Sequence, residues 1–219
     1  MSNEKEIDEL REAVINFDSG AAKSAAQKVI DSKVDPIRAI KEISVVIRDV
    51  GDKFESGELF LPHLVMAADA MKAAIDIFET HLPKEKIKET RLGTVVIGTV
   101  KGDIHDIGAY IMGMMLTAAG FEVINLGKDV PIESFINKAQ EVDADIIGLS
   151  SLLLATMSVQ RELIEELNKR GLRDRFKVMV GGGPVTKEWA KEIGANGQGY
   201  DAIEAVEVAK ELIGAKAIN

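Results

Sequence analysis

The sequence contains no cysteine among its 219 residues. That absence excludes disulfide bonds, thiolate metal sites and cysteine nucleophiles. Aromatic residues make up only 5% of the chain, which argues against stacking platforms for nucleic-acid bases. Basic residues are also in deficit, because 27 Lys and Arg stand against 36 Asp and Glu, a formal net charge of −9. This balance disfavours nucleic acid and anionic membranes as partners.

Long apolar segments are missing as well. No apolar run approaches the roughly 20 residues that a membrane-spanning helix needs. The first six residues are mostly polar or charged, so we expect no secretory signal peptide. These features predict a soluble, cytoplasmic protein. Its length allows one large domain or two small ones, with a core that needs no disulfide.

The N-terminal part of the chain carries only helical periodicity, with apolar residues recurring at three- and four-residue steps in four stretches. The segment Asp18-Ser19-Gly20 is expected to interrupt the helical pattern between the first and the second of these stretches. Asp35 followed by Pro36 predicts an N-cap and a first helical residue, and Pro62 is expected to open the fourth helix. Four helices with short connections predict an antiparallel bundle, which we assign to residues 1–85 as a cap domain.

A charged connector at residues 83–91 leads to a second part with a different rhythm. Short apolar segments alternate there with helical ones, as in a parallel sheet covered on both faces. Five such units predict a doubly wound, flavodoxin-like α/β domain over residues 92–219. We expect strands at residues 93–100, 122–126, 145–150, 177–181 and 196–197, and helices at 106–119, 132–142, 157–170, 186–193 and 201–213.

The first of these strands leads into the most distinctive loop of the sequence, which carries Asp103 and His105. In a parallel sheet this loop lies at the carboxyl edge, where ligands bind. Asp103 is close enough to hydrogen-bond one ring nitrogen of His105, which is the arrangement of an oriented metal-ligand histidine. A histidine that only caps the loop is the alternative, and these residues alone leave both interpretations open.

Two further strand ends are expected at the same edge of the sheet. Gly148-Leu149-Ser150 ends the third strand, with Thr156 six residues later, and Gly181-Gly182-Gly183-Pro184 ends the fourth. Glycines at such positions let a ligand lie directly against the backbone. A tight strand-to-helix turn or a phosphate nest is the alternative. The spacing matches neither the dinucleotide-binding fingerprint nor the P-loop.

Together these motifs resemble the corrinoid proteins of anaerobic methyltransferase systems and the cobalamin module of methionine synthase. The resemblance covers nearly the whole chain. It is carried by Asp103-x-His105-x-x-Gly108, Gly148-Leu149-Ser150, Gly181-Gly182-Gly183-Pro184, Phe54 and Phe60-Leu61-Pro62.

The resemblance implies a role for each of these positions. His105 would be the lower axial ligand of cobalt, displacing the dimethylbenzimidazole base, and Asp103 would set its basicity. Thr156 would relay to that aspartate. The remaining members would line the cofactor: Ser150 at the displaced base, Gly108, Gly148, Gly181 and Gly182 along the nucleotide-tail channel, and Phe54 and Leu61 over the upper face. Gln198 stands where several relatives carry tyrosine.

The function implied by the resemblance is that of a methyl carrier in methanogenesis or acetogenesis. Cobalt would cycle between a methylated Co(III) state, as in methylcobalamin, and a nucleophilic Co(I) state, and an imidazole coupled to a carboxylate can leave the metal and take up a proton. A substrate-specific methyltransferase would load the methyl group, a second one would pass it to a thiol or a pterin, and a reductive activase is a further partner. Methylamines are the expected donors, ahead of methanol, betaines and methoxyaromatics.

The sequence has no segment long enough to form a barrel that binds a methyl donor, so the chain is not expected to be a complete enzyme alone. Two other functions stay open. A small subunit of an adenosylcobalamin-dependent mutase is disfavoured by a bundle that would seal the upper face. A cobalamin sensor is disfavoured because the chain shows no helix-turn-helix or basic output segment.

Overall fold

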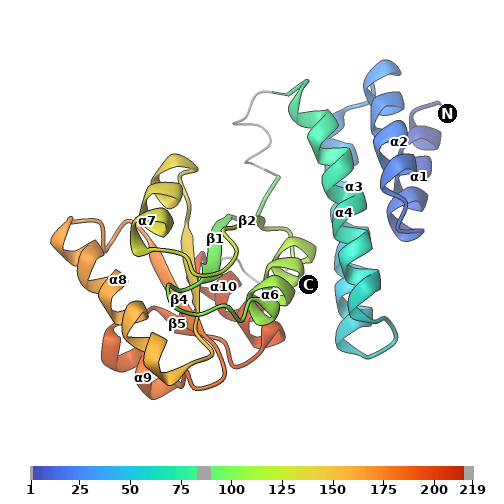
Figure 1. The fold of residues 1–219 in the computed structure, drawn as a ribbon. Coiled ribbons are helices and arrows are strands. Elements are labelled where there is room, and N and C mark those ends of the chain that lie inside the picture. Colours follow the sequence, from blue (N-terminus) through green and yellow to red (C-terminus); the bar gives the residue numbers. More distant parts are fainter. Residues whose placement is uncertain (1, 83–89, 215–219) are drawn as a thin grey trace. The chain divides into compact units, whose positions relative to one another are not determined.

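The structure, a computed structural model, describes residues 2–82 and 90–214 (Figure 1). The chain divides into two compact units, one consisting mainly of residues 1–91 and the other mainly of residues 92–219. Most of the connector expected at residues 83–91 lies outside the described residues. No helix within the described ranges is long and apolar enough to cross a membrane.

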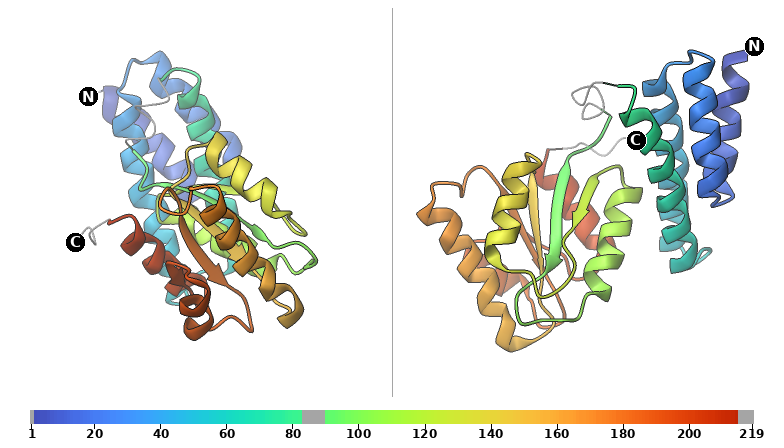
Figure 2. Two further views of the ribbon diagram at one scale, coloured as in Figure 1. Left: turned by 90° about the vertical axis from the view of Figure 1, so that its left-hand side faces the viewer. Right: turned by 45° about the horizontal axis from the view of Figure 1, so that its top comes forward.

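Four helices with short connections build the first unit, and Figure 2 shows them side by side. Their apolar stripes form its interior, where Leu10, Ile43 and Leu64 are fully buried. Asp35 caps its helix as the sequence predicts, because its carboxylate accepts the Ile37 backbone N–H at 3.0 Å. The helices are α1 (Ser2–Ile15), α2 (Ser19–Asp31), α3 (Pro36–Glu55) and α4 (Leu61–Glu79).

The break after α1 lies earlier than the sequence suggests. Phe17 has a φ of 59°, in the left-handed region, and turns the chain there. Asp18 then caps α2, since its side chain accepts the Ala21 backbone N–H at 2.8 Å. Gly20 lies inside the first turn of α2. The predicted break at residues 18–20 was therefore wrong, because these residues begin the second helix.

The second unit contains a five-stranded sheet in the order β2-β1-β3-β4-β5, with every neighbouring pair parallel. This order confirms the predicted flavodoxin-like, doubly wound topology. The strands are β1 (Thr94–Thr99), β2 (Glu122–Asn125), β3 (Ile146–Ser150), β4 (Lys177–Gly181) and β5 (Gly197–Gln198).

Helices cover both faces of this sheet. Figure 1 shows α7, α8 and α9 on one face and α6 and α10 on the other. Phe135, Leu163 and Val178 belong to the buried cluster between the sheet and the first group of helices. The helix bounds are α6 (Ile107–Ala118), α7 (Ile132–Glu141), α8 (Met157–Lys169), α9 (Lys187–Ile193) and α10 (Ala202–Leu212), and a 3-10 turn, Leu154–Thr156, precedes α8.

Candidate functional site

The sequence-predicted polar residues of the second unit gather where the strand order reverses. β2 lies on one side of β1 and β3 on the other, and the carboxyl edge at such a reversal is where doubly wound sheets bind their ligands. Thr99, the last residue of β1, is in register with Ser150, the last residue of β3. The two loops that follow these residues therefore begin next to each other.

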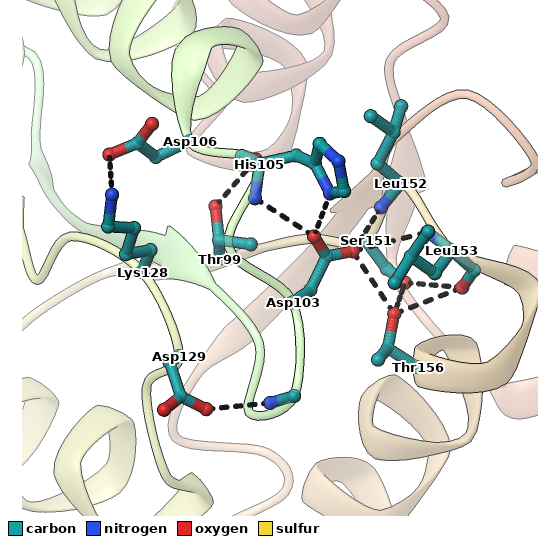
Figure 3. Close-up of polar contacts among 11 residues, drawn as sticks. Thr99, Asp103, His105, Asp106, Lys128, Asp129, Ser151, Leu152, Leu153 and Thr156 are labelled. Atoms are coloured by element: carbon teal, nitrogen blue, oxygen red, sulfur yellow. Dashed lines mark hydrogen bonds and ion pairs between the residues drawn. The ribbon is translucent and has the colours of Figure 1, made fainter.

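Asp103 is the centre of this site (Figure 3). Its side chain is fully buried, and each carboxylate oxygen accepts several hydrogen bonds. Oδ1 accepts the backbone N–H of His105 at 3.0 Å and the ring Nδ1–H at 2.7 Å. Oδ2 accepts the backbone N–H groups of Leu152 at 2.7 Å and Leu153 at 3.1 Å, and the hydroxyl of Thr156 at 3.1 Å. The buried charge is thus compensated by donors from two loops.

These donors decide the protonation state of the carboxylate. Burial raises the pKa of Asp103, but the hydrogen bonds from His105, followed by those from Leu152 and Leu153, together outweigh it. They lower the pKa from 3.8 to about 2. Asp103 is therefore ionised at neutral pH and acts only as a hydrogen-bond acceptor.

His105 presents its ring at the surface while its partner lies inside the fold. Its side chain is 47% exposed, against 0% for Asp103. Because an ionised carboxylate can only accept, Nδ1 carries the proton of the 2.7 Å bond, and Nε2 of the neutral ring keeps its lone pair. No described residue is recorded as hydrogen-bonding Nε2. The carboxylate thus orients the imidazole ring and, when the ring is neutral, fixes its tautomer, as in a metal-ligand pair.

The hydroxyl of Thr156 extends the network away from the ring. The Thr156 and Ser151 hydroxyl oxygens lie 2.7 Å apart, and both side chains are buried. If Ser151 donates to Thr156 and Thr156 donates to Asp103, each of these two contacts holds one proton. The Leu153 carbonyl, 3.0 Å from the Thr156 hydroxyl and 3.1 Å from the Ser151 hydroxyl, is the competing acceptor. This assignment gives a continuous chain from Ser151 through Thr156 and Asp103 to His105.

The other predicted residues of the second unit lie at the same sheet edge without joining this network. Ser150 ends β3 and is partly buried, and Gly148 lies within the same strand. Gly181 ends β4, where its carbonyl accepts the Ser151 backbone N–H at 3.0 Å. Gln198 is buried in β5 and donates its side-chain N–H to a backbone carbonyl at 3.2 Å, so its amide is engaged inside the fold.

The two remaining predicted residues, Phe54 and Leu61, belong to the first unit. Phe54 lies next to the end of α3, and Leu61 is the first residue of α4. Both side chains are partly buried. Phe54 and Leu61 thus stand on either side of the short turn between α3 and α4.

Gly182 and Gly108 are glycines for different reasons. Gly182 has a φ of +126°, and a Cβ added there would lie 1.8 Å from the Ser151 carbonyl oxygen. Backbone packing alone requires glycine at that position. Gly108 lies in the first turn of α6 without a positive φ, and a Cβ there would meet nothing within 4 Å. Packing does not explain its missing side chain, and it leaves open space three residues after His105 for a ligand.

Sequence reasoning missed several contributors to the site. Ser151 and the backbone N–H groups of Leu152 and Leu153 hold Asp103 and its relay, but backbone donors leave no trace in a residue pattern. The sequence did contain a signal for an apolar surface at this site, because three leucines, Leu152 to Leu154, directly follow the two serines at the end of β3. The loops after β1 and β3 expose five large apolar side chains, namely Ile104, Ile107, Leu152, Leu153 and Leu154. Such a collar fits a flat ligand that is largely apolar.

The donor set also limits the kind of metal that could bind. Within the described residues, no three His, Asp or Glu side chains are grouped so as to hold a metal ion. A single outward imidazole instead suits a metal that already has its equatorial ligands from a macrocycle. The open space at Gly108 and the apolar collar agree with such a group. Fold and site therefore define a doubly wound protein with one oriented, outward-facing histidine at the sheet edge where such folds bind their ligands.

Comparison with known proteins agrees with this class. Two family models, each described as a B12 binding domain, match residues 93–207 and residues 6–79. A corrinoid protein from Desulfitobacterium hafniense strain Y51 is 47% identical over 210 residues, covering 95% of this chain and 97% of that protein. Dimethylamine corrinoid protein 1 from Methanosarcina acetivorans is 46% identical over 214 residues, covering 97% and 100%. In the crystal structure of the methanol:cobalamin methyltransferase complex from Methanosarcina barkeri, one chain matches with a TM-score of 0.84 and 28% identity, covering 97% of this chain and 81% of that one.

The chain belongs to the corrinoid proteins, which bind a cobalamin-type cofactor in a B12-binding domain. The resemblance inferred from the sequence is thereby confirmed, as is the corrinoid cofactor. The chain is the cofactor-bearing subunit of a methyltransferase system and is not a complete enzyme alone. These findings favour a methyl carrier over a mutase subunit or a sensor.

Proposed function

We propose that the chain carries a methyl group on a corrinoid whose cobalt takes His105 as its lower axial ligand. The observation that carries this proposal is the Asp103–His105 pair, in which a buried carboxylate fixes the tautomer of a half-exposed ring at 2.7 Å. The bound cobalt supplies the centre that accepts the methyl group and releases it. The chain supplies the ligand, its orientation and a place for a proton.

The hydrogen-bond network around Asp103 suits a histidine that would both coordinate the cobalt and dissociate from it. While Nε2 offers its lone pair, the Asp103 carboxylate accepts from Nδ1 and increases the basicity of the ring. When Nε2 is released it can take up a proton, and the resulting imidazolium remains paired with the same carboxylate. Thr156 and the backbone N–H groups of Leu152 and Leu153 hold that carboxylate in place throughout, because they donate to Oδ2, the oxygen that does not contact the ring.

The remaining predicted site residues keep proposed roles of different strength. Gly108 is supported by the open space at its missing side chain. Ser150, Gly148, Gly181 and Gly182 are proposed to line the nucleotide tail because of the resemblance and their place at the sheet edge. We propose in the same way that residues 92–219 bind the corrinoid and that residues 1–85 cap it, with Phe54 and Leu61 over the reactive upper face.

The proposed methyl donor is a methylamine. This choice is supported by the 46% identity to a dimethylamine corrinoid protein over nearly the full length of both chains. A substrate-specific methyltransferase would load the chain, as suggested by the solved complex in which a similar protein takes part. A second methyltransferase would transfer the methyl group from the chain to a thiol or a pterin. A reductive activase would reduce cofactor that has become oxidised. A cytoplasmic location stays a prediction that cell fractionation tests.

The decisive experiment is paramagnetic resonance of the cobalamin-loaded protein in its Co(II) form. We expect splitting from one protein nitrogen, and we expect His105→Ala to remove it because no other described histidine belongs to this unit's site. His63→Ala is the matched control, since His63 lies in α4 of the first unit. The control should keep the splitting. Splitting that survives in His105→Ala would show that another group binds the cobalt.

A further inference from the structure

The loop that carries Asp103 and His105 is held from a second side by the loop between β2 and α7. The Thr99 N–H donates to the Gly127 carbonyl at 2.8 Å, and the Val130 N–H donates to the Thr99 carbonyl at 3.0 Å. Val100 and Val130 form an isolated parallel bridge beyond the ends of β1 and β2. This pairing brings the residue before Val130 alongside the histidine loop.

That residue, Asp129, makes two hydrogen bonds to the loop. Its backbone N–H donates to the carbonyl of Asp103 at 3.0 Å, and its carboxylate Oδ1 accepts the backbone N–H of Gly102 at 2.7 Å (Figure 3). Gly102 has a φ of 84° and Asp129 a φ of 54°, so two left-handed residues meet at this point. Aspartate and asparagine adopt this conformation more readily than most residues with a side chain.

The position of Gly102 makes this contact relevant to the ligand. Gly102 directly precedes Asp103, and glycine has the widest range of backbone angles. Unless its N–H is held, rotation about Gly102 can swing the Asp103 backbone and, with it, the histidine two residues further on. The β3 loop contacts the carboxylate of Asp103, and the Asp103 N–H donates to the Val100 carbonyl at 3.1 Å within the histidine loop itself. The Thr99 hydroxyl donates to the His105 carbonyl at 3.2 Å. Asp129 adds, from a different loop, contacts to the backbone on both sides of the Gly102–Asp103 peptide.

We propose that Asp129 is a positioning residue for the His105 ligand, acting through its hydrogen bond to Gly102. This inference rests on the proposed function, because it takes His105 to be the cobalt ligand. Asp129 contacts neither the ring nor the carboxylate of Asp103 in any recorded hydrogen bond. It sets the path of the backbone that carries both.

The test compares Asp129→Gly with Asp129→Asn in the cobalamin-loaded full chain. Both replacements tolerate a φ near 54°, but only asparagine keeps an oxygen that can accept the Gly102 N–H. The first readout is the ratio of histidine-bound to histidine-free Co(II) in paramagnetic resonance. The second is the hydrogen-exchange rate of the Gly102 amide. Lys138→Ala is the control, because Lys138 lies in α7, which follows the same loop, and pairs with Glu141 rather than with the histidine loop.

We expect Asp129→Gly to lower the histidine-bound ratio by roughly two- to fivefold, the change expected from losing one solvent-exposed hydrogen bond. Exchange at Gly102 should accelerate in the same variant. Asp129→Asn and Lys138→Ala should match the wild type in both readouts. A role confined to general stability would lower the melting temperature and leave the ratio unchanged.

A wild-type ratio in Asp129→Gly would overturn the proposal, and so would an Asp129→Asn variant with a lowered ratio, since the carboxylate charge would then be the cause. If Asp129→Gly does not fold, Asp129→Ala removes the same acceptor: a lowered histidine-bound ratio supports the proposal and a wild-type ratio overturns it. Failure of the proposed function looks different, because the wild-type protein itself would then show no nitrogen splitting.

Discussion

At the scale of single residues, Asp103 contributes both to the stability of the fold and to the orientation of the His105 ring. Its carboxylate is buried without a lysine or arginine beside it, and its donors are N–H groups, one hydroxyl and the ring of His105. Each of these donors favours the ionised form. A change at Asp103 should therefore affect both the histidine and the loop after β3.

Asp103 should make the stability of the cofactor-free protein depend on acid. Folding lowers its pKa from 3.8 to about 2. A group with a depressed pKa contributes stability above its unfolded value and loses that contribution as the pH falls through the folded value. We expect Asp103→Asn to be less stable than the wild type at neutral pH, because the new amide N–H₂ would face backbone donors.

The difference in free energy of unfolding between the two proteins should then shrink between about pH 4 and about pH 2. Urea unfolding of both proteins across this range measures it. Glu165→Gln is a control for general acid effects, since Glu165 is an exposed residue of α8. A difference for Asp103→Asn that is the same at every pH would contradict the assignment.

At the scale of elements, the turns at the carboxyl edge of the sheet contain two kinds of glycine. One is required for packing, and the other leaves space that a ligand could occupy. After β4, Gly182 approaches the loop after β3 so closely that its missing side chain is needed for packing. At the start of α6, Gly108 has no such neighbour. Two glycines that look equivalent in the motif pattern are thus expected to respond differently to the same substitution.

Gly182→Ala should destabilise the fold by roughly 3 kcal/mol or more, because it adds a steric clash to an unfavourable backbone angle. Gly108→Ala should leave stability unchanged or raise it by up to about 1 kcal/mol, since alanine is the better helix former. The same Gly108→Ala variant should bind cobalamin more weakly. Urea unfolding and a cobalamin titration distinguish the two effects. Undiminished cobalamin binding by Gly108→Ala would mean that the ligand does not use this space.

At the scale of the whole molecule, both compact units match B12-binding family models, so corrinoid binding is a property of the full chain. The first unit offers no buried carboxylate–histidine pair among its described residues. Its proposed contribution is apolar cover, which would keep water and oxidants away from the upper face of the cofactor.

Phe54→Ala tests that cover. Cofactor affinity should stay nearly unchanged, because the proposed lower ligand, His105, lies in the other unit. Photolysis of bound methylcobalamin and oxidation of the reduced form should both accelerate, as followed by absorbance. Val45→Ala is the matched control on the same helix, since Val45 is an exposed apolar residue of α3. Rates equal to those of the wild type in Phe54→Ala would argue against the cover.

Much of this architecture could be predicted from local patterns. Apolar runs, N-caps and glycines located the strands and helices to within a few residues, and the alternation of strand and helix predicted the doubly wound order. The exception at the first helix shows the limit of the method. Phe17 adopts a left-handed turn that its residue type does not signal, and Asp18 was taken as a break although aspartate is a good N-cap.

The pairing of Asp103 with His105 could be predicted from the sequence, because a separation of two residues places the two side chains within reach of each other. The partners of Asp103 on the β3 loop were decided by the tertiary structure. Leu152, Leu153 and Thr156 are 49, 50 and 53 residues away along the chain, and only the adjacency of β1 and β3 brings them to the carboxylate. Asp129, which follows β2, reaches Gly102 across 27 residues because β2 also lies next to β1 in the sheet. Covalent geometry controls contacts between near neighbours, whereas the order of strands in the sheet controls contacts between loops.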